Sequence, residues 1–325
     1  MRHRPRTAAA LCAAALALTG CAGADTADTN AAPDPDTVLE NCGSDVALDG
    51  APTQAVTLNQ AATEIMLSLG LEGSMAGTAY LDDTIAPELR SAYDSVPLLA
   101  QEYPSQENLL AASPDFVYAS YASAFDDAAA GSRDELADLA VATYLSPAAC
   151  PQQSQRLTQD FDAVYQEIIE IGALFEVPER AEALVDELKS TVAQATADDA
   201  GAGRTAVLWD SGTQAPSVAS GAGMGGYLLE SAGLQNVFAD DADSPYVDTS
   251  WEAIVDADPD VIVLVDAEWD PAADKIAFLQ SDPATAQLTA VQNNAYVTLP
   301  FVATTVGLRA VDGLVALDQQ LAANG

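Results

Sequence analysis

The sequence has almost no histidine: the single residue of this type among 325 is His3. A Ser-His-Asp triad, a Cys-His pair and nearly all catalytic zinc sites need an imidazole. Because His3 stands at the very start of the chain, ahead of any segment that can build a domain, these chemistries are excluded. Sites that take zinc or manganese directly through histidine ligands are disfavoured by the same observation.

Basic residues are also scarce, with 11 Lys and Arg against 49 Asp and Glu and a formal net charge of −38. Binding to nucleic acid depends on clustered cations that release counterions from phosphates, so this balance excludes nucleic acid as a partner. Docking of the folded protein on anionic lipid is disfavoured for the same reason. We interpret the acidity as self-repulsion that keeps an exposed protein soluble.

Long apolar runs are missing, since a membrane-spanning helix needs about 18 consecutive apolar residues and no segment supplies them. The Ala- and Leu-rich residues 7–18 are too few, and they follow a basic segment that contains Arg2, Arg4 and Arg6. A charged segment followed by a short apolar stretch is typical of a secretory signal peptide. We therefore predict a signal peptide at residues 1–20 and an extracytoplasmic mature protein.

The end of this signal matches the bacterial lipobox, Leu18-Thr19-Gly20-Cys21. We expect Cys21 to be acylated and to anchor the protein to the outer face of the cell membrane through the lipid alone. Residues 21–41 then consist mainly of Ala, Asp, Thr and Pro. Such a segment cannot bury enough apolar surface to offset its ordering entropy, so we predict a flexible tether.

Cysteine is the next scarce residue, with four in the chain. Cys12 leaves with the signal peptide and Cys21 is acylated, which leaves Cys42 and Cys150 in an oxidising compartment. We predict a disulfide between these two. A two-cysteine metal site is the weaker alternative because no histidine is available to complete it. We expect no cofactor and no metal bound directly by the protein.

From residue 42 onward, apolar stretches of strand length alternate with helical patterns, as at residues 55–69, 116–139 and 261–280. This alternation is typical of parallel α/β architecture. We predict an α/β fold with two Rossmann-like lobes, at residues 42–177 and 201–325. A helical pattern that begins at Pro178 predicts one long helix over residues 178–200, which spans about 30 Å and joins the lobes.

The two halves share a local pattern that begins at Ser105 in one and at Ser250 in the other. In both copies a glutamate follows two positions later, and Pro-Asp follows at nine and ten positions. An acidic residue favours the start of a helix, and Pro-Asp ends it before a strand. Spacing alone leaves open whether Glu107 and Glu252 serve helix formation or a partner.

Two further segments accompany this repeat: Asn-Gln-Ala-Ala-Thr-Glu-Ile-Met-Leu-Ser-Leu-Gly-Leu at residues 59–71, and Gly-Leu-Arg-Ala-Val-Asp at residues 307–312. Together these motifs resemble the vitamin B12 and ferric-siderophore substrate-binding protein family of ABC importers, over essentially all of the chain from Cys42. The resemblance implies two lobes joined by one rigid helix, a ligand cleft between them and little hinge closure. It also implies docking of Glu107 and Glu252 into arginine pockets of a permease dimer that works with an ATPase.

Open α/β sheets bind ligands at the carboxyl ends of their strands. Aromatic residues there suit a large, partly apolar metal chelate, although Trp209 fits core packing equally well. Arg309 either pairs with Asp312 at i+3 or faces an anionic ligand group. The candidate ligand-binding residues are Asn59, Tyr80, Tyr103, Tyr121, Trp209, Asp210, Glu268, Trp269 and Arg309.

We therefore predict a monomeric binding protein and no enzyme, with a ferric siderophore or a corrinoid as its small-molecule ligand. A catecholate siderophore calls for several cations, so the few basic residues favour a hydroxamate. A deazaflavin cofactor precursor is an alternative ligand. The alternative class is an exported enzyme that uses carboxylate pairs such as Asp82-Asp83 or Asp240-Asp241, but such pairs arise by chance among 49 acidic residues.

Overall fold

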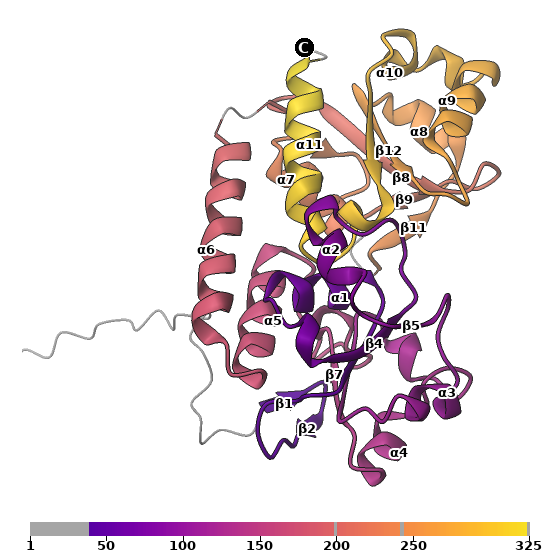
Figure 1. Ribbon diagram of the computed structural model, residues 1–325. Helices are drawn as coiled ribbons and strands as arrows, with labels where there is room; N and C mark the ends of the chain where they lie inside the picture. The colour runs from indigo at the N-terminus through magenta and orange to yellow at the C-terminus, as the bar shows by residue number, and fades with distance from the viewer. Residues whose placement is uncertain (1–38, 198–199, 241–243, 324–325) are drawn as a thin grey trace, which may run out of the picture.

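The computed structural model describes residues 39–197, 200–240 and 244–323. The signal peptide predicted at residues 1–20, the lipidation site Cys21 and nearly all of the predicted tether lie outside the described residues. The described chain forms two α/β lobes, one above the other in Figure 1, with helix α6 (Pro178–Ala195) running beside both.

The N-terminal lobe is built on a five-stranded parallel sheet of order β5-β4-β3-β6-β7. Its central strands are apolar and fully buried, as expected for parallel strands covered on both faces. Phe116 and Tyr118 of β6 face one side of the sheet, and Val117 and Ala119 face the other. The strands are β3 (Ala55–Leu58), β4 (Met75–Ala79), β5 (Leu98–Ala100), β6 (Phe116–Ala119) and β7 (Ala142–Leu145). The helices are α1 (Gln60–Ser68), α2 (Arg90–Tyr93), α3 (Gln106–Ala111) and α4 (Arg133–Asp138), with 3-10 turns η1 (Glu72–Ser74), η2 (Pro87–Leu89), η3 (Ala122–Phe125) and η4 (Pro147–Ala149).

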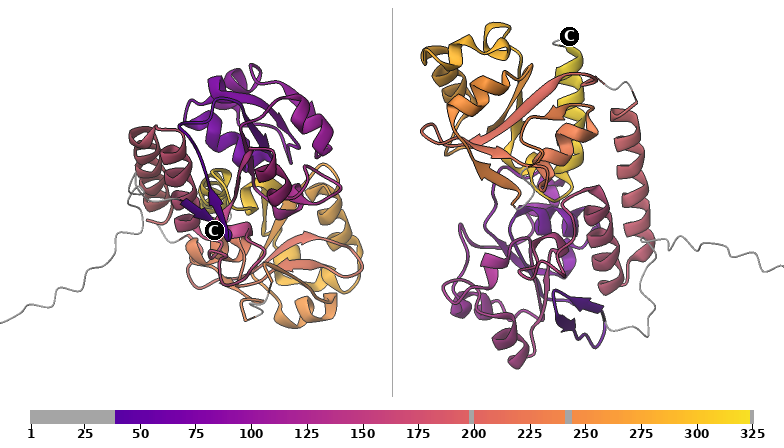
Figure 2. Two further views of the ribbon diagram at one scale, coloured as in Figure 1. Left: turned by 90° about the horizontal axis from the view of Figure 1, so that it is seen from below. Right: turned by 180° about the vertical axis from the view of Figure 1, so that it is seen from behind.

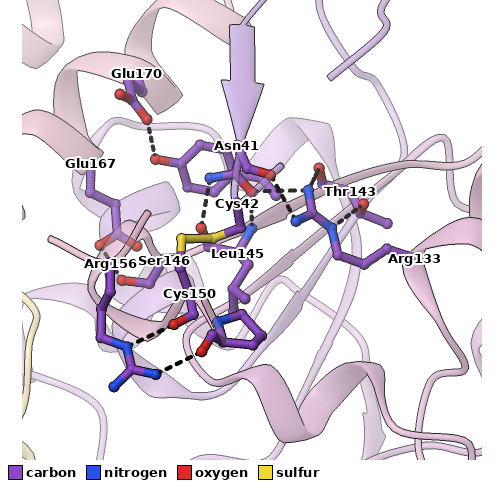
Figure 3. Close-up of a disulfide and its surroundings, with 12 residues drawn as sticks. Asn41, Cys42, Arg133, Thr143, Leu145, Ser146, Cys150, Arg156, Glu167 and Glu170 are labelled. Atoms are coloured by element: carbon purple, nitrogen blue, oxygen red, sulfur yellow. Dashed lines mark hydrogen bonds between the residues drawn. A yellow bond between two sulfur atoms is a disulfide. The ribbon is translucent and has the colours of Figure 1, made fainter. Parts of the chain in front are cut away.

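A short hairpin, β1 (Leu39–Asn41) and β2 (Ser44–Val46), precedes this lobe. Its turn residues Cys42 and Gly43 have φ of 52° and 79°, the left-handed pair that tight hairpin turns require. The turn is joined to the lobe by a disulfide between Cys42 and Cys150, with Cα atoms 5.2 Å apart (Figure 3). The Asn41 amide also donates to the carbonyl of Leu145 and accepts from its backbone N–H, both at 2.8 Å.

The C-terminal lobe contains a six-stranded sheet of order β11-β9-β8-β12-β13, with β10 on β8. The β8, β12 and β13 strands are parallel, whereas β9 pairs antiparallel with both β8 and β11. The strands are β8 (Thr205–Ser211), β9 (Ser217–Ala219), β10 (Gln235–Asn236), β11 (Tyr246–Asp248), β12 (Val261–Asp266) and β13 (Tyr296–Pro300). The helices are α7 (Met224–Ser231), α8 (Trp251–Ala257), α9 (Ala272–Ser281), α10 (Thr289–Gln292) and α11 (Arg309–Ala323), with 3-10 turns η5 (Thr285–Gln287) and η6 (Phe301–Thr304).

The lobes are connected by two packed helices, α5 (Phe161–Leu174) and α6. At about 1.5 Å per residue, the 18 residues of α6 extend about 27 Å. The α6 helix packs on α5 of the first lobe and on α11 of the second (Figures 1 and 2). One apolar cluster passes from Phe116 through Ile168 and Val185 to Leu314, so the core is continuous between the lobes. This continuity resists hinge motion.

The repeat seen in the sequence folds alike in both lobes. Ser105 caps α3 and Ser250 caps α8, each accepting a hydrogen bond from a backbone N–H in the first turn. Ser113 and Asp258, at matching positions, are both left-handed with φ of 52° and 40°. The following Asp115 and Asp260 accept from Thr53 and Thr205, respectively, just before or at the first strand of their lobe's sheet. Most residues of the repeat therefore cap a helix, end it or connect it to the sheet.

Candidate functional site

The candidate site lies between the lobes, where the loops after the parallel strands of both sheets meet. From the N-terminal lobe it receives Asn59 after β3, Tyr80 after β4 and Tyr121 after β6. The C-terminal lobe contributes the segment that follows β13, up to Arg309. Ligands of open α/β sheets bind at this end of the strands.

Three of the predicted residues form a cluster on the N-terminal lobe. The Tyr103 hydroxyl donates to Asn59 Oδ1 at 2.9 Å and lies 3.2 Å from Ser123 Oγ. The Tyr80 ring meets the Tyr103 ring edge-on, with centroids 4.5 Å apart. Asn59 and Tyr80 have φ of 78° and 58°, a left-handed conformation that is uncommon outside glycine. This strained backbone at two adjacent strand ends turns both side chains into the cluster.

Tyr121 lies at the contact between the lobes, where it lines the interlobe cavity together with Thr305 of the C-terminal lobe. Burial, together with the nearby Asp82, raises the pKa of Tyr121 above its ordinary value. The lobes also touch at Gly307, where a Cβ atom would come within 2.8 Å of the Cβ of Ala61. Larger residues at position 307 would push the lobes apart.

Beside these contacts is a small interlobe cavity of about 10 Å³. Glu64 and Asp82 line it from the N-terminal lobe and Arg309 lines it from the C-terminal lobe. Arg309 Nη1 lies 3.4 Å from Glu64 Oε1, and Arg309 Nε lies 3.0 Å from Asp312 Oδ2. Arg309 therefore pairs with Asp312, as one of the two interpretations expected, and it also lines the cavity. Its contact with an anionic ligand group stays a prediction. The full lining is Gln60, Ala61, Glu64, Asp82, Tyr121, Val302, Thr305, Gly307, Leu308 and Arg309.

Two of these residues, Glu64 and Asp82, were not among the predicted binding residues. Burial raises the pKa of Glu64, opposed by hydrogen bonds from Gln60 and Ala86 and by Arg309. Burial likewise raises the pKa of Asp82 to about 6. Their positions in the sequence could have indicated them. Glu64 lies one helical turn after Gln60 in the segment that follows the first strand, and Asp82 lies two residues after Tyr80.

An open hollow of about 490 Å³ adjoins Arg309 and provides more space than the interlobe cavity. Arg90 and Arg309 are its cations, and Thr84, Ile85 and Pro87 complete its lining. The two spaces share Arg309, so the guanidinium stands at the boundary between them.

In the C-terminal lobe, the half-buried Asp210 is the penultimate residue of β8 and accepts from Ser211 Oγ at 2.8 Å. Burial raises its pKa, and the charge of Asp210 in turn contributes, after burial, to a raised pKa of Tyr246. Lys275 of α9 joins the ends of β8 and β12 to the loop that carries Asp270. Its ammonium group donates to the carbonyls of Asp210 and Val265 and lies 3.3 Å from Asp270 Oδ2.

Trp269 is 64% exposed and packs its ring edge-on against Phe301, with centroids 5.3 Å apart. Its neighbour Glu268 is exposed as well. Both lie on the loop between β12 and α9, at the carboxyl end of the sheet. This aromatic surface is accessible to a ligand.

Trp209 was predicted to contact ligand, and that prediction is wrong. Its side chain is 1% exposed and belongs to the apolar cluster on the outer face of the C-terminal sheet. Trp251 and Phe278 pack on it at centroid distances of 4.7 and 6.0 Å, and its indole N–H donates to the Ser211 carbonyl. Side chains alternate along β8, so Trp209 points away from the cleft.

Glu107 and Glu252 are exposed in the first turns of α3 and α8. Neither lines the interlobe spaces described above. Their helices belong to different lobes and lie on the side of the molecule opposite α6 (Figure 1).

In the described ranges, no group of three or more acidic, cysteine or histidine side chains is arranged to hold a metal ion. Nor does any described helix combine the length and apolar character needed to cross a membrane.

Two α/β lobes, a stiff connection and an interlobe cavity lined by Tyr121 and carboxylate groups are the architecture of a solute-binding protein. The chain belongs to the periplasmic binding protein family, whose profile matches residues 56–303. Members of this kind are the substrate-binding components of ABC transporters. No curated protein matches the chain.

Solved structures agree with the family. A periplasmic binding protein from Veillonella parvula is 26% identical over 88% of this chain and 97% of its own, with a TM-score of 0.79. A protein of an ABC-type Fe³⁺-hydroxamate transport system from Saccharomonospora viridis is 28% identical over 87% and 98%, with a TM-score of 0.71. A haem-binding protein from Roseiflexus is 21% identical over 85% and 99%, with a TM-score of 0.65, and shares the fold.

Proposed function

We propose that this protein captures a ferric hydroxamate chelate between its lobes and delivers it to an ABC permease. The observation that carries the proposal is the presence of aromatic side chains near the carboxyl ends of the strands in both lobes, Tyr80 and Tyr103 in one and Trp269 in the other. The cations of the neighbouring spaces are Arg90 and Arg309. A ferric trihydroxamate core is uncharged and partly apolar, so it can bury against aromatic faces without paired charges. The similarity to the Fe³⁺-hydroxamate protein of Saccharomonospora viridis supports this choice.

Other ligand classes fit the charges less well. A ferric catecholate is strongly anionic and haem carries two carboxylates, whereas the cavity lining holds one cation, Arg309, beside Glu64 and Asp82. Bringing an anion into such a site costs free energy through like-charge repulsion and desolvation. A corrinoid and a deazaflavin precursor remain competitors to be tested beside the hydroxamate.

The most direct test of this function is the ligand that the native protein retains. We expect mass spectrometry of the protein purified without denaturation from iron-limited cells to show one equivalent of iron with a hydroxamate chelator. Retention of haem, a corrinoid or a deazaflavin in its place would contradict the proposal.

The proposal includes membrane attachment through an acylated Cys21, which holds the domain near its permease. Because the segment after Cys21 consists mainly of Ala, Asp, Thr and Pro and can bury little apolar surface, Cys21→Ala should release the protein without lowering its melting temperature. Detergent-phase partitioning measures this. A mutant that still partitions with the detergent phase as wild type does would refute the lipid anchor.

A further inference from the structure

The interlobe cavity holds more carboxylates than cations. Glu64 and Asp82 line it, and the only cation of the described lining is Arg309. Arg309 is already close to two carboxylates, Glu64 at 3.4 Å and Asp312 at 3.0 Å. These carboxylates offset its positive charge, while its Nε has no hydrogen-bond partner among the described residues. With two carboxylates and one cation, the lining has a net negative charge and favours an incoming cation.

Glu64 has one carboxylate oxygen that lacks a donor. The side chain is 1% exposed, and its Oε1 accepts from Gln60 Nε2 at 2.9 Å and from the Ala86 N–H at 3.0 Å. Its buried Oε2 finds no hydrogen-bond partner in the part of the chain that the structure describes. Buried polar atoms are nearly always hydrogen-bonded, because leaving one unpaired costs free energy. Since Glu64 lines the cavity, a ligand group can supply the missing donor.

Asp82 is a second carboxylate without a cation. Its Oδ2 accepts from the Gln60 N–H at 3.3 Å, and no ion pair joins it to a described Lys or Arg. Its pKa of about 6 has the same origin, because burial disfavours the charged form when no cation is near. A cation in the cavity would favour the ionised form of Asp82.

The size of the cavity restricts the group that can enter. Its volume of about 10 Å³ is close to the smallest space that holds a single water molecule. A primary ammonium group is of similar size and presents three hydrogen-bond donors. A carboxylate is larger and, when ionised, has no donor to offer Glu64.

We propose that this cavity is a subsite for a primary ammonium group on the ligand, so that the protein selects cationic over anionic ferric hydroxamates. The inference rests on the proposed function. The chelated iron lies against the aromatic side chains outside, and the ammonium end reaches Glu64 and Asp82. The competing arrangement places an anionic end in the hollow between Arg90 and Arg309.

A charge series on one chelator separates these arrangements. The probes share one linear ferric trihydroxamate core. The first has a free terminal ammonium and is positive, its N-acetyl form is neutral, and its N-succinyl form is negative. Titration of the wild-type protein should give an ammonium form that binds about tenfold or more tightly than the succinyl form, with the acetyl form between them. Equal affinities, or tightest binding of the succinyl form, would overturn the inference.

Two variants locate the effect. Asp82→Asn should lower the ammonium-to-succinyl ratio by about threefold or more because one carboxylate is lost from the subsite. Asp186→Asn removes the same charge from the exposed face of α6 and should leave the ratio unchanged. An unchanged ratio in Asp82→Asn would also refute the subsite. If none of the three chelates binds, the proposed function fails; if all bind alike, only the ammonium subsite fails.

Discussion

On α5, the buried Glu167 and the half-buried Glu170 accept hydrogen bonds from hydroxyl groups, and no ion pair joins either to a described Lys or Arg (Figure 3). Glu167 is 2% exposed and accepts from the hydroxyls of Tyr118 at 2.5 Å and Ser146 at 2.7 Å. Glu170 accepts from the Tyr144 hydroxyl at 2.6 Å. Burial raises the pKa of Glu167 to about 7, although both hydrogen bonds act to lower it.

This arrangement predicts a specific pH dependence. Between its unfolded pKa near 4.5 and its folded pKa of about 7, Glu167 binds more protons in the folded state, so the free energy of unfolding should fall as pH rises through this window. The full effect is up to about 3 kcal/mol. Denaturant unfolding of wild type and Glu167→Gln from pH 4.5 to 7.5 measures it. The wild-type curve should fall relative to the variant, and parallel curves would contradict the raised pKa.

The buried Lys275 is the donor to three groups of the C-terminal lobe. Lys275→Met keeps an apolar stem beside Trp209 but leaves the carbonyls of Asp210 and Val265 and the Asp270 carboxylate without their donor. Calorimetry should show a loss of about 3–5 kcal/mol of unfolding free energy. Ligand affinity should fall too, since the freed loop carries Trp269.

The matched control is Lys189→Met on α6, whose ammonium lies over the Tyr165 ring and has no such network. It should cost about 1 kcal/mol or less. Equal losses in the two lysine variants would show that Lys275 does not hold the cleft edge.

The positions of Asn59, Tyr80 and Tyr121 after strands could be predicted, because the end of an apolar run is visible in the sequence. Tyr103 was predicted only from its place shortly before Glu107. Sequence reasoning missed Glu64 because a glutamate inside a helix is normally solvent-exposed. In the folded protein this residue is 1% exposed, between Gln60 and Ala86 of its own lobe and Arg309 of the second. Trp209 was misplaced because its side of the strand depends on register, which sequence alone does not reveal.

At the scale of helices, the crossing of α5 and α6 depends on a glycine. A Cβ atom at Gly172 would lie 2.3 Å from the Cβ of Ala181, so Gly172→Ala must separate the two helices. Overpacking of this kind costs about 1–3 kcal/mol and outweighs the gain in helix propensity of about 1 kcal/mol. Thermal unfolding of the variant should show a lower melting temperature.

Gly73→Ala is the control, because no atom lies within 4 Å of the added Cβ. Its melting temperature should stay near that of wild type. A Gly172→Ala protein as stable as this control would mean that the helices do not pack as closely as described.

Element order and the repeated capping pattern were readable from the sequence, since Ser, Glu and Pro-Asp act locally. The antiparallel β9 and β11 strands were not, because they are short and pair only in the folded lobe. The core that continues through α5, α6 and α11 also needed the structure, because it joins residues far apart in the chain.

For the whole molecule, the exposed glutamates on α3 and α8 predict a separation of transport from binding. Glu107→Ala with Glu252→Ala should leave ligand affinity unchanged and lower stability by only about 0.3–1 kcal/mol per site. Uptake should fall strongly, because truncating a charge paired with arginine across a desolvated interface costs about 2–5 kcal/mol. Reconstituted uptake, affinity and melting temperature are measured on the same variant.

The control removes two glutamates from the opposite side, Glu182 and Glu187 on α6. This variant should transport normally. Normal uptake by the Glu107 and Glu252 variant with intact binding would assign both residues to helix formation alone.

The choice of ligand can be measured by a tryptophan-fluorescence titration of the purified protein with a ferric trihydroxamate, haem, a corrinoid and a deazaflavin precursor. Trp269 is the exposed tryptophan of the described chain and reports on the mouth of the cleft. We expect the ferric trihydroxamate to give saturable, one-to-one quenching at a lower concentration than any competitor. Saturation by a competitor with no response to the hydroxamate would contradict this expectation.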